Sequence, residues 1–251
     1  MKESYRENFA TQAEAARYEA GEYAANSYAC LLWELEQTAL TPLLREFRGT
    51  HSQIGYLDFA SGTGRLPSFM EERVDASTSI EISESMAAVA RQRLRRTQVL
   101  CADITAAAGV EGQYDLITAF RFFLNAEPSL RTAAMRALAT RLRDERSWLV
   151  FNNHGNLWSV KLLAWPLHWL RRLGKGWLPQ GNTMRHAEVV RLIEGAGLRL
   201  VRRVGLGVLG GTLCRLLPYQ TALRIEQWCM DRPWINWAGQ DIIYVVCRDV
   251  S

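Results

Sequence analysis

The chain has 251 residues, of which 48% are hydrophobic and 22% are charged, an ordinary composition for a globular protein with a full core. Its five cysteines form no C-x-x-C pair and its four histidines show no paired ligand spacing, so we expect no zinc site and no disulfide framework. The formal net charge of +4 is carried mainly by arginine, and the basic run at residues 91–96 ends a predicted helix, where cations are favourable. We therefore expect no nucleic acid partner.

Neither a signal peptide nor a membrane span is predicted. Residues 1–7 have no apolar core, and no run of about 18 apolar residues occurs in the chain. We therefore expect a cytoplasmic protein with a single domain over residues 1–251, either a monomer or a homodimer.

Aromatic residues recur at near-helical spacing before the first predicted strand, at Tyr18, Tyr23, Tyr28 and Trp33. One interpretation is the apolar side of one or two packing helices. The other is an N-terminal helical lid over residues 1–49, with Tyr28 and Trp33 in contact with a substrate.

Residues 54–59 predict a strand, and residues 65–73 a helix, joined by a turn of small residues. The backbone amides of such a turn point at a ligand on the helix N-terminus. A dinucleotide fingerprint requires glycine at Ala60 and glycine or alanine at Arg65, and neither is present. Asp58 at the strand tip instead suits a cofactor with positive charge beyond its nucleoside, such as S-adenosylmethionine.

The next two predicted strands, at residues 77–82 and 98–102, are also followed or ended by acids. Glu81 is placed to accept hydrogen bonds from the ribose hydroxyls, and Asp103 to accept one from the adenine amino group. Ile82, Met86 and Ile104 are expected to form apolar walls around the ring. Ser83 is the predicted N-cap of the helix that follows Glu81. A fourth strand is predicted at residues 114–120.

With these motifs, residues 50–250 resemble the class I S-adenosylmethionine-dependent methyltransferases of the small-molecule type. The resemblance implies an α/β fold, a Rossmann-like three-layer sandwich whose seven-stranded sheet is mostly parallel with the last strand antiparallel, plus N-terminal helices and a helical cap. It implies S-adenosyl-L-methionine as cofactor and S-adenosyl-L-homocysteine as product. Family loops usually carry glycine where Ala60 stands, so a different backbone path or weaker affinity is expected there.

The resemblance also extends the set of expected cofactor contacts to the whole loop and to the end of the fourth strand. The complete set is Asp58, Ala60, Ser61, Gly62, Thr63, Gly64, Arg65, Glu81, Ile82, Met86, Asp103, Ile104, Ala119 and Phe120.

Strands and helices continue to alternate beyond residue 120. Helices are predicted at 128–142 and 186–196, the latter with Thr183 as a possible cap, and strands at 148–151, 198–204 and 241–247. We therefore divide the chain into a cofactor-binding core (50–156), a cap insertion (157–182) and C-terminal core strands (183–251) with an insertion at 205–240.

The end of the strand at 148–151 carries a cluster of amides and one histidine, where the acceptor is expected. His154 is a candidate to take the acceptor's proton, or else a hydrogen-bonding residue of the loop. Asn153 is a candidate substrate contact. Arg121 and Asn125 are candidates to hold a polar or anionic acceptor, although Asn125 is alternatively a cap of the helix at Pro128.

Residues 157–177 are dense in tryptophan, including Trp158 and Trp165, with basic residues between them. One interpretation is a cap that lines an aromatic acceptor pocket, which Pro166 favours by interrupting the segment. The other is an amphipathic helix on an anionic membrane surface. The tryptophans of residues 216–237 are expected to pack beside this segment.

The expected activity is methyl transfer to an oxygen or nitrogen of a small, hydrophobic or aromatic metabolite in a biosynthetic pathway. Three alternatives stay open. They are methylation of a lipid-linked or sugar acceptor at a membrane surface, a non-methyl reaction that uses the cofactor's fixed charge, and a non-catalytic binding subunit.

Overall fold

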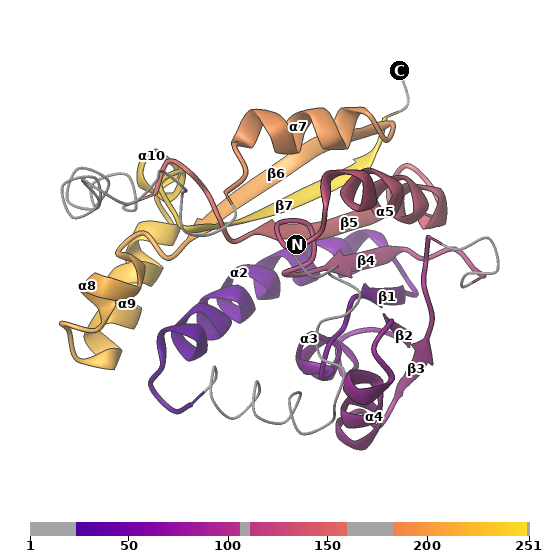
Figure 1. The fold of residues 1–251 in the computed structure, drawn as a ribbon, viewed down its shortest axis with the longest axis horizontal. Coiled ribbons are helices and arrows are strands. Elements are labelled where there is room, and N and C mark those ends of the chain that lie inside the picture. Colours follow the sequence, from indigo (N-terminus) through magenta and orange to yellow (C-terminus); the bar gives the residue numbers. More distant parts are fainter. Residues whose placement is uncertain (1–23, 106–110, 160–182, 250–251) are drawn as a thin grey trace, which may run out of the picture.

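The computed structural model describes residues 24–105, 111–159 and 183–249 (Figure 1). Trp165, most of the expected cap at 157–182 and the first 23 residues of the expected lid lie outside the described residues.

Seven strands form one sheet in the order β3-β2-β1-β4-β5-β7-β6 (Figure 1). β7 pairs antiparallel with both of its neighbours, and the other pairings are parallel. The expected sheet with its last strand antiparallel is confirmed. The strands are β1 (Gly55–Phe59), β2 (Ala76–Glu81), β3 (Thr97–Cys101), β4 (Leu116–Ala119), β5 (Trp148–Asn153), β6 (Leu198–Leu206) and β7 (Asp241–Arg248).

The labelled helices lie between the strands and before the first of them. They are α2 (Tyr28–Thr50), α3 (Arg65–Met70), α4 (Glu84–Arg93), α5 (Pro128–Arg141), α7 (His186–Glu194), α8 (Gly210–Cys214), α9 (Tyr219–Met230) and α10 (Pro233–Asn236).

One of the predicted helix caps is correct and two are not. The Ser83 hydroxyl accepts a hydrogen bond from the Met86 amide and caps α4 as expected. Thr183 does not cap α7, because the helix begins after Arg185, whose amide donates to the Glu188 carboxylate at 3.1 Å. Asn125 does not cap α5, because its side-chain amide donates to the Arg121 carbonyl oxygen at 2.7 Å.

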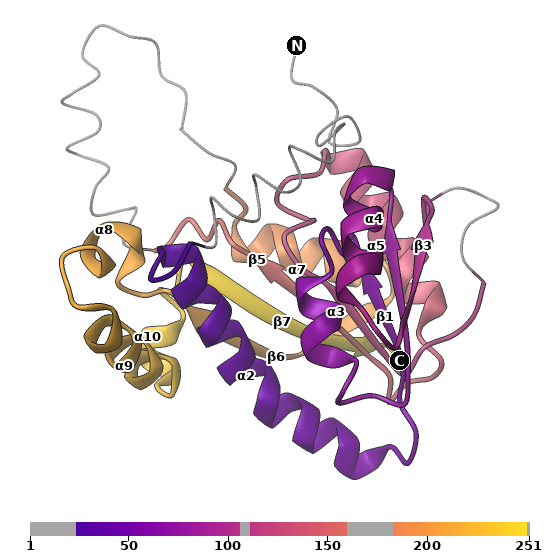
Figure 2. The same ribbon diagram turned by 90° about the horizontal axis from the view of Figure 1, so that it is seen from below.

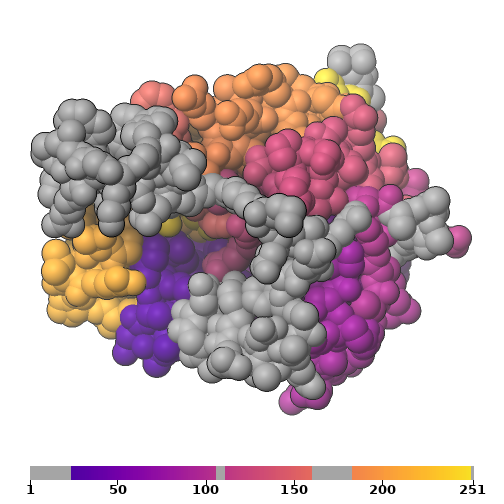
Figure 3. Space-filling model, in the orientation of Figure 1, coloured from indigo at the N-terminus to yellow at the C-terminus, as the bar shows by residue number. Residues whose placement is uncertain are grey.

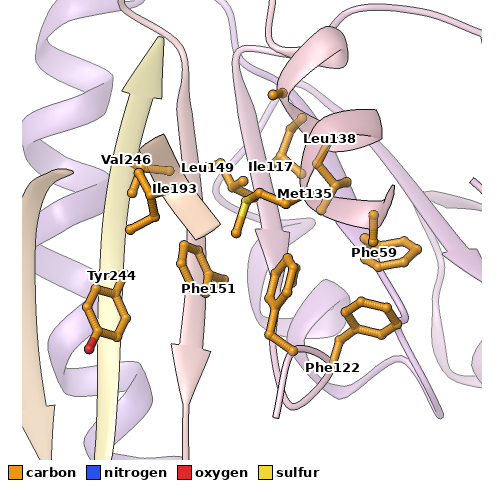
Figure 4. Close-up of a cluster of buried hydrophobic side chains, with 14 of the residues drawn as sticks. Phe59, Ile117, Phe122, Met135, Leu138, Leu149, Phe151, Ile193, Tyr244 and Val246 are labelled. Atoms are coloured by element: carbon orange, nitrogen blue, oxygen red, sulfur yellow. The ribbon is translucent and has the colours of Figure 1, made fainter. Parts of the chain in front are cut away.

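Helices cover both faces of the sheet, so the molecule has three layers. Along β7, Tyr244 and Val246 pack with the cluster under α5 and α7, whereas Ile243 and Val245 pack with the cluster under α2. This two-residue alternation is the pattern of a strand buried on both faces. Figure 4 shows the cluster on the α5 and α7 face.

The 205–240 insertion folds as α8, α9 and α10 and packs beside the N-terminal half of α2 (Figure 2). The Tyr219 hydroxyl of α9 donates to the Glu34 carboxylate of α2 at 2.6 Å. A Cβ added to Gly205 would lie 1.6 Å from the Asn236 carbonyl oxygen. Glycine is therefore required for the insertion to reach the backbone of β6.

Candidate functional site

The predicted site residues gather at one edge of the sheet. Parallel strands end at the same edge, and an antiparallel strand begins there, so the ends of β1, β2, β4 and β5 meet the start of β7. The strand order reverses between β1 and β4, which is where ligands bind in open α/β sheets.

The loop after β1 takes three residues through the left-handed backbone region, Ala60 (φ 57°), Gly62 (φ 55°) and Gly64 (φ 79°). A Cβ added to Gly64 would lie 3.0 Å from the Leu94 side chain, so this glycine lets the loop pack on α4. A Cβ on Gly62 would meet nothing within 4 Å, so the loop faces open space there. Ala60 therefore adopts the left-handed conformation that glycine adopts easily, and its Cβ makes this conformation unfavourable.

We expect Ala60→Gly to raise the free energy of unfolding by about 1 kcal/mol, because it removes the Cβ clash of the left-handed conformation. Urea unfolding measures the change. Ala133→Gly, at an exposed position inside α5, is the matched control and is expected to lose about 1 kcal/mol. A loss of stability in both variants would contradict the strain at Ala60.

Glu81, the last residue of β2, holds this loop. It is 8% exposed, and its two carboxylate oxygens accept hydrogen bonds from the backbone amides of Gly62 at 2.8 Å and Ser83 at 2.9 Å. Burial raises the pKa of Glu81, while the amide hydrogen bonds oppose that rise. Each oxygen keeps a second lone pair, so the carboxylate can also accept hydroxyl donors.

Asp58 lies in β1, one residue before its end, and is 2% exposed. The Thr118 hydroxyl donates a short hydrogen bond to this carboxylate, and the Tyr56 hydroxyl lies 2.6 Å from Thr118 Oγ1. Burial raises the pKa of Asp58 to about 7, with the hydrogen bonds of Thr118 and Tyr56 opposing the rise. A cation placed beside Asp58 would favour its ionised form. Tyr56 and Thr118 were not predicted as site residues, because no local sequence pattern marks them.

The expected adenine residues lie beyond β2 and β3. Ile82 is 39% exposed, whereas Met86 and Ile104 are buried behind the edge. Asp103 Oδ1 accepts hydrogen bonds from the Thr105 amide at 2.9 Å and the Thr105 hydroxyl at 2.6 Å, so this carboxylate also shapes its own turn.

On the other side of the edge a polar network joins α2, β4, β5 and β7. The Arg121 amide donates to Asn152 Oδ1 at 2.6 Å, and Asn152 Nδ2 donates to Asp241 Oδ2 at 2.9 Å. The Arg121 guanidinium pairs with the buried Glu36 carboxylate at 3.0 Å. Asp241 is 1% exposed, and burial raises its pKa to about 7, with the Glu36 charge raising and the Arg121 charge lowering it. The network holds Arg121 at a positive φ of 59°.

Of the residues in this network, Arg121 was predicted from the sequence as a site residue, whereas Glu36, Asn152 and Asp241 were not. Asp241 could have been predicted, because it is the first residue of a strand expected to be antiparallel, which begins at the edge where the parallel strands end.

The other acceptor candidates occupy different surroundings. Asn153 is buried, and its amide donates to the Met184 carbonyl at 2.8 Å and accepts from the Gly155 amide at 3.2 Å, so it anchors the loop after β5. His154, the next residue, is half-buried at the edge. Ala119 is buried at the end of β4, followed by the partly buried Phe120, and Asn125 is exposed.

Residues 57–145 match the family model of the methyltransferase domain. The fold agrees with this match, since magnesium protoporphyrin IX methyltransferase from Synechocystis PCC 6803, solved with bound S-adenosylhomocysteine, superimposes with a TM-score of 0.62 over 97% of both chains at 14% identity. Residues 57–145 therefore match a methyltransferase domain, and the chain as a whole has the fold of solved methyltransferases.

Two further solved structures share the methyltransferase fold. The N-methyltransferase NodS from Bradyrhizobium japonicum WM9, with S-adenosylhomocysteine, has a TM-score of 0.58 at 13% identity over 96% of both chains. The cyclase SpnF has a TM-score of 0.52 at 17% identity over 85% of this chain and 81% of its own. No curated protein matches the chain in sequence.

The residues of the methyltransferase domain fit its cofactor. The Ser61 hydroxyl oxygen in the loop is buried without a hydrogen-bond partner among the described residues, and the space beside Gly62 is open. A polar ligand bound in this loop would supply the hydrogen-bond partner that the Ser61 hydroxyl lacks. Within the described residues no group of three or more side chains is arranged to hold a metal ion.

The aromatic substrate candidates occupy three different surroundings. Trp33 packs edge-on against Phe69 at 6.0 Å and, with Arg65, lines an open hollow of about 360 Å³ between α2 and α3. The structure thus brings a predicted substrate residue beside a predicted cofactor residue. Tyr28 packs against Gly207 and Gly211, and its buried hydroxyl has no hydrogen-bond partner in the described part of the chain. Trp158 is 54% exposed.

Proposed function

We propose that the protein transfers the methyl group of S-adenosylmethionine to an oxygen or nitrogen of a small, hydrophobic or aromatic acceptor. The observation that supports this most is Glu81, whose carboxylate ties the left-handed loop at Gly62 to the N-terminus of α4. The loop thereby has a fixed shape before any ligand arrives, as preorganised binding requires.

In this proposal each acid at a strand end binds a different part of the cofactor. Glu81 accepts the ribose hydroxyls, and Asp103 with Ile82 contacts the adenine. The loop amides and Ser61 hold the methionine part, whose cationic groups lie toward Asp58. A cation there favours the Asp58 carboxylate, which burial otherwise keeps near half protonation at neutral pH.

The bound cofactor supplies an electrophilic methyl group on a good leaving group. The protein's part is to align the acceptor atom with that methyl group and to keep water out. His154 is the proposed proton acceptor for a hydroxyl or ammonium acceptor, because it is a half-buried imidazole at the end of β5. In this proposal Arg121, held by Asn152 and Glu36, lies beneath the bound acceptor.

Calorimetry tests the cofactor site. We expect wild-type protein to release part of a proton at neutral pH when S-adenosylmethionine binds, because the cation lowers the pKa of Asp58. The proton count comes from titrations in buffers of different ionisation enthalpy. S-adenosylhomocysteine, which lacks the sulfonium charge, is expected to release less, and Asp58→Asn is expected to release none and to bind S-adenosylmethionine at least about tenfold more weakly. Equal proton release from wild type and Asp58→Asn would contradict the placement of Asp58.

A second candidate function is a non-methyl reaction on the same cofactor fold. The structural likeness to the cyclase SpnF supports it. Product analysis separates the two, because methyl transfer forms one S-adenosylhomocysteine for each acceptor consumed, whereas a cyclisation forms none. We further propose a cytoplasmic location and a small-molecule acceptor.

A further inference from the structure

Four large aromatic side chains stand exposed near the 205–240 insertion. Trp158 is 54% exposed, Trp228 48%, Trp234 70% and Trp237 45%. We call these four residues the tryptophan surface. A tryptophan can bury roughly 150–250 Å², so the partial exposure of these four residues leaves apolar area in water that a partner could cover.

Hydrogen bonds tie three members of the tryptophan surface together. The Trp237 indole nitrogen donates to the Trp234 carbonyl oxygen at 2.8 Å. Asn156 Nδ2 donates to the Trp237 carbonyl oxygen at 3.0 Å, and Asn156 Oδ1 accepts from the Trp158 amide at 3.2 Å. Trp158, Trp234 and Trp237 are therefore neighbours, although they come from the loop after β5 and from the end of the insertion.

Two arginines near Trp228 add positive charge to this surface. Arg224 lies one turn before Trp228 on α9, opposite the buried Ala222, Glu226 and Cys229. The Arg232 guanidinium stacks on the Trp228 ring at 3.8 Å. Neither arginine has an ion pair within the described residues, and the exposed acid of this segment is Asp231.

The insertion lies at one end of the molecule, where both ribbon views place α8, α9 and α10 together (Figures 1 and 2). In the space-filling view this block forms one outer corner (Figure 3). The described residues contain no helix with the length and apolar character to cross a bilayer.

We propose that the tryptophan surface rests in the headgroup region of an anionic bilayer, with Arg224 and Arg232 facing the lipid phosphates. Indole rings with an apolar body and a polar N–H suit that layer, and unpaired arginines complement its charge. Asn156 joins this surface to the loop after β5, so a bilayer bound here lies beside the acceptor edge of the sheet. The inference is independent of catalysis and of the identity of the acceptor.

Vesicle sedimentation of the full chain without cofactor tests the proposal. We expect the protein to sediment with vesicles of equal parts phosphatidylcholine and phosphatidylglycerol, and at least about tenfold less with phosphatidylcholine alone. Replacing Trp228, Trp234 and Trp237 together with alanine should reduce the partition coefficient at least about tenfold. The double variant Arg224→Gln, Arg232→Gln should also reduce it about tenfold and weaken its dependence on salt.

Two controls carry exposed changes elsewhere. Val201→Ala removes an exposed apolar side chain of β6, and Arg146→Gln removes an exposed arginine before β5, at the opposite edge of the sheet. Both should sediment as wild type does, and thermal unfolding should be cooperative in every variant. The proposal is overturned if wild type stays in solution with anionic vesicles, if the tryptophan variant binds equally well, or if that variant instead converts a dimer to a monomer.

Discussion

Replacing Glu81 with alanine is expected to weaken S-adenosylmethionine binding by about a hundredfold or more. The change removes the proposed acceptors for the ribose hydroxyls, and it also frees the Gly62 and Ser83 amides that the carboxylate holds. Hydrogen bonds to a charged group contribute about 1.5–3 kcal/mol each, so losing two of them accounts for that factor. Calorimetric titration of both proteins measures it.

The chain offers a matched control for this variant. Glu71 is also a buried glutamate, and its carboxylate accepts hydrogen bonds from the Arg95 and Arg96 amides at 3.2 and 2.9 Å, at the opposite end of β3 from Asp103. Glu71→Ala should lose comparable stability and keep its cofactor affinity within about twofold. Similar losses of affinity in both variants would mean that Glu81 acts only through stability.

Stability is expected to fall as the pH rises from about 4 to about 7, and Asp241→Asn should remove part of that fall. Burial, with the Glu36 charge, raises the pKa of Asp241 from 3.8 to about 7. Between those values the folded state binds more protons than the unfolded state, so each rise in pH favours unfolding. At about 1.4 kcal/mol per pKa unit, the Asn variant should gain a few kcal/mol at neutral pH and little near pH 4.

Urea unfolding across this pH range measures both proteins. Asp144→Asn is the control with the opposite sign, because hydrogen bonds from Ser147 and Arg146 outweigh burial and lower the pKa of Asp144. That variant should lose stability at neutral pH and approach wild type in acid. A wild-type protein whose stability rises steadily from pH 4 to 7 would contradict the buried, proton-binding state of Asp241.

The strands and the cofactor loop were predictable because their signals are local. Apolar runs mark the strands, and the small residues from Ala60 to Gly64 mark the turn, so errors were confined to at most three residues at element ends and to two helix caps. The acceptor-side network was not predictable in the same way. Arg121 and Glu36 are 85 residues apart in sequence, and Asn152 and Asp241 are 89 apart, so only the assembled sheet brings them together.

The tryptophans of the insertion show a second limit of sequence patterns. The tryptophans of residues 216–237 were expected to pack beside the segment 157–177, most of which lies outside the described residues, and Trp228, Trp234 and Trp237 are exposed. The helical spacing on α9 indicates this exposure, because Trp228 lies one turn after Arg224 and on the side of the helix opposite the buried Glu226. A hydrophobic residue type alone does not determine burial.

The reversed direction of β7 has a consequence for how this fold can change. β6 ends and β7 begins at the same edge, so the whole connection from 207 to 240 leaves and re-enters the sheet without crossing it. A change in the length of this contiguous piece requires no change in strand register by itself, whereas its residues Cys214, Ala222 and Leu223 belong to the core under α2. The proposed cofactor contacts come from four separate connections, at Ala60, Ile82, Asp103 and Phe120. Replacing the segment 207–240 would therefore change the surface beside the proposed acceptor edge and leave the four connections with the proposed cofactor contacts unchanged.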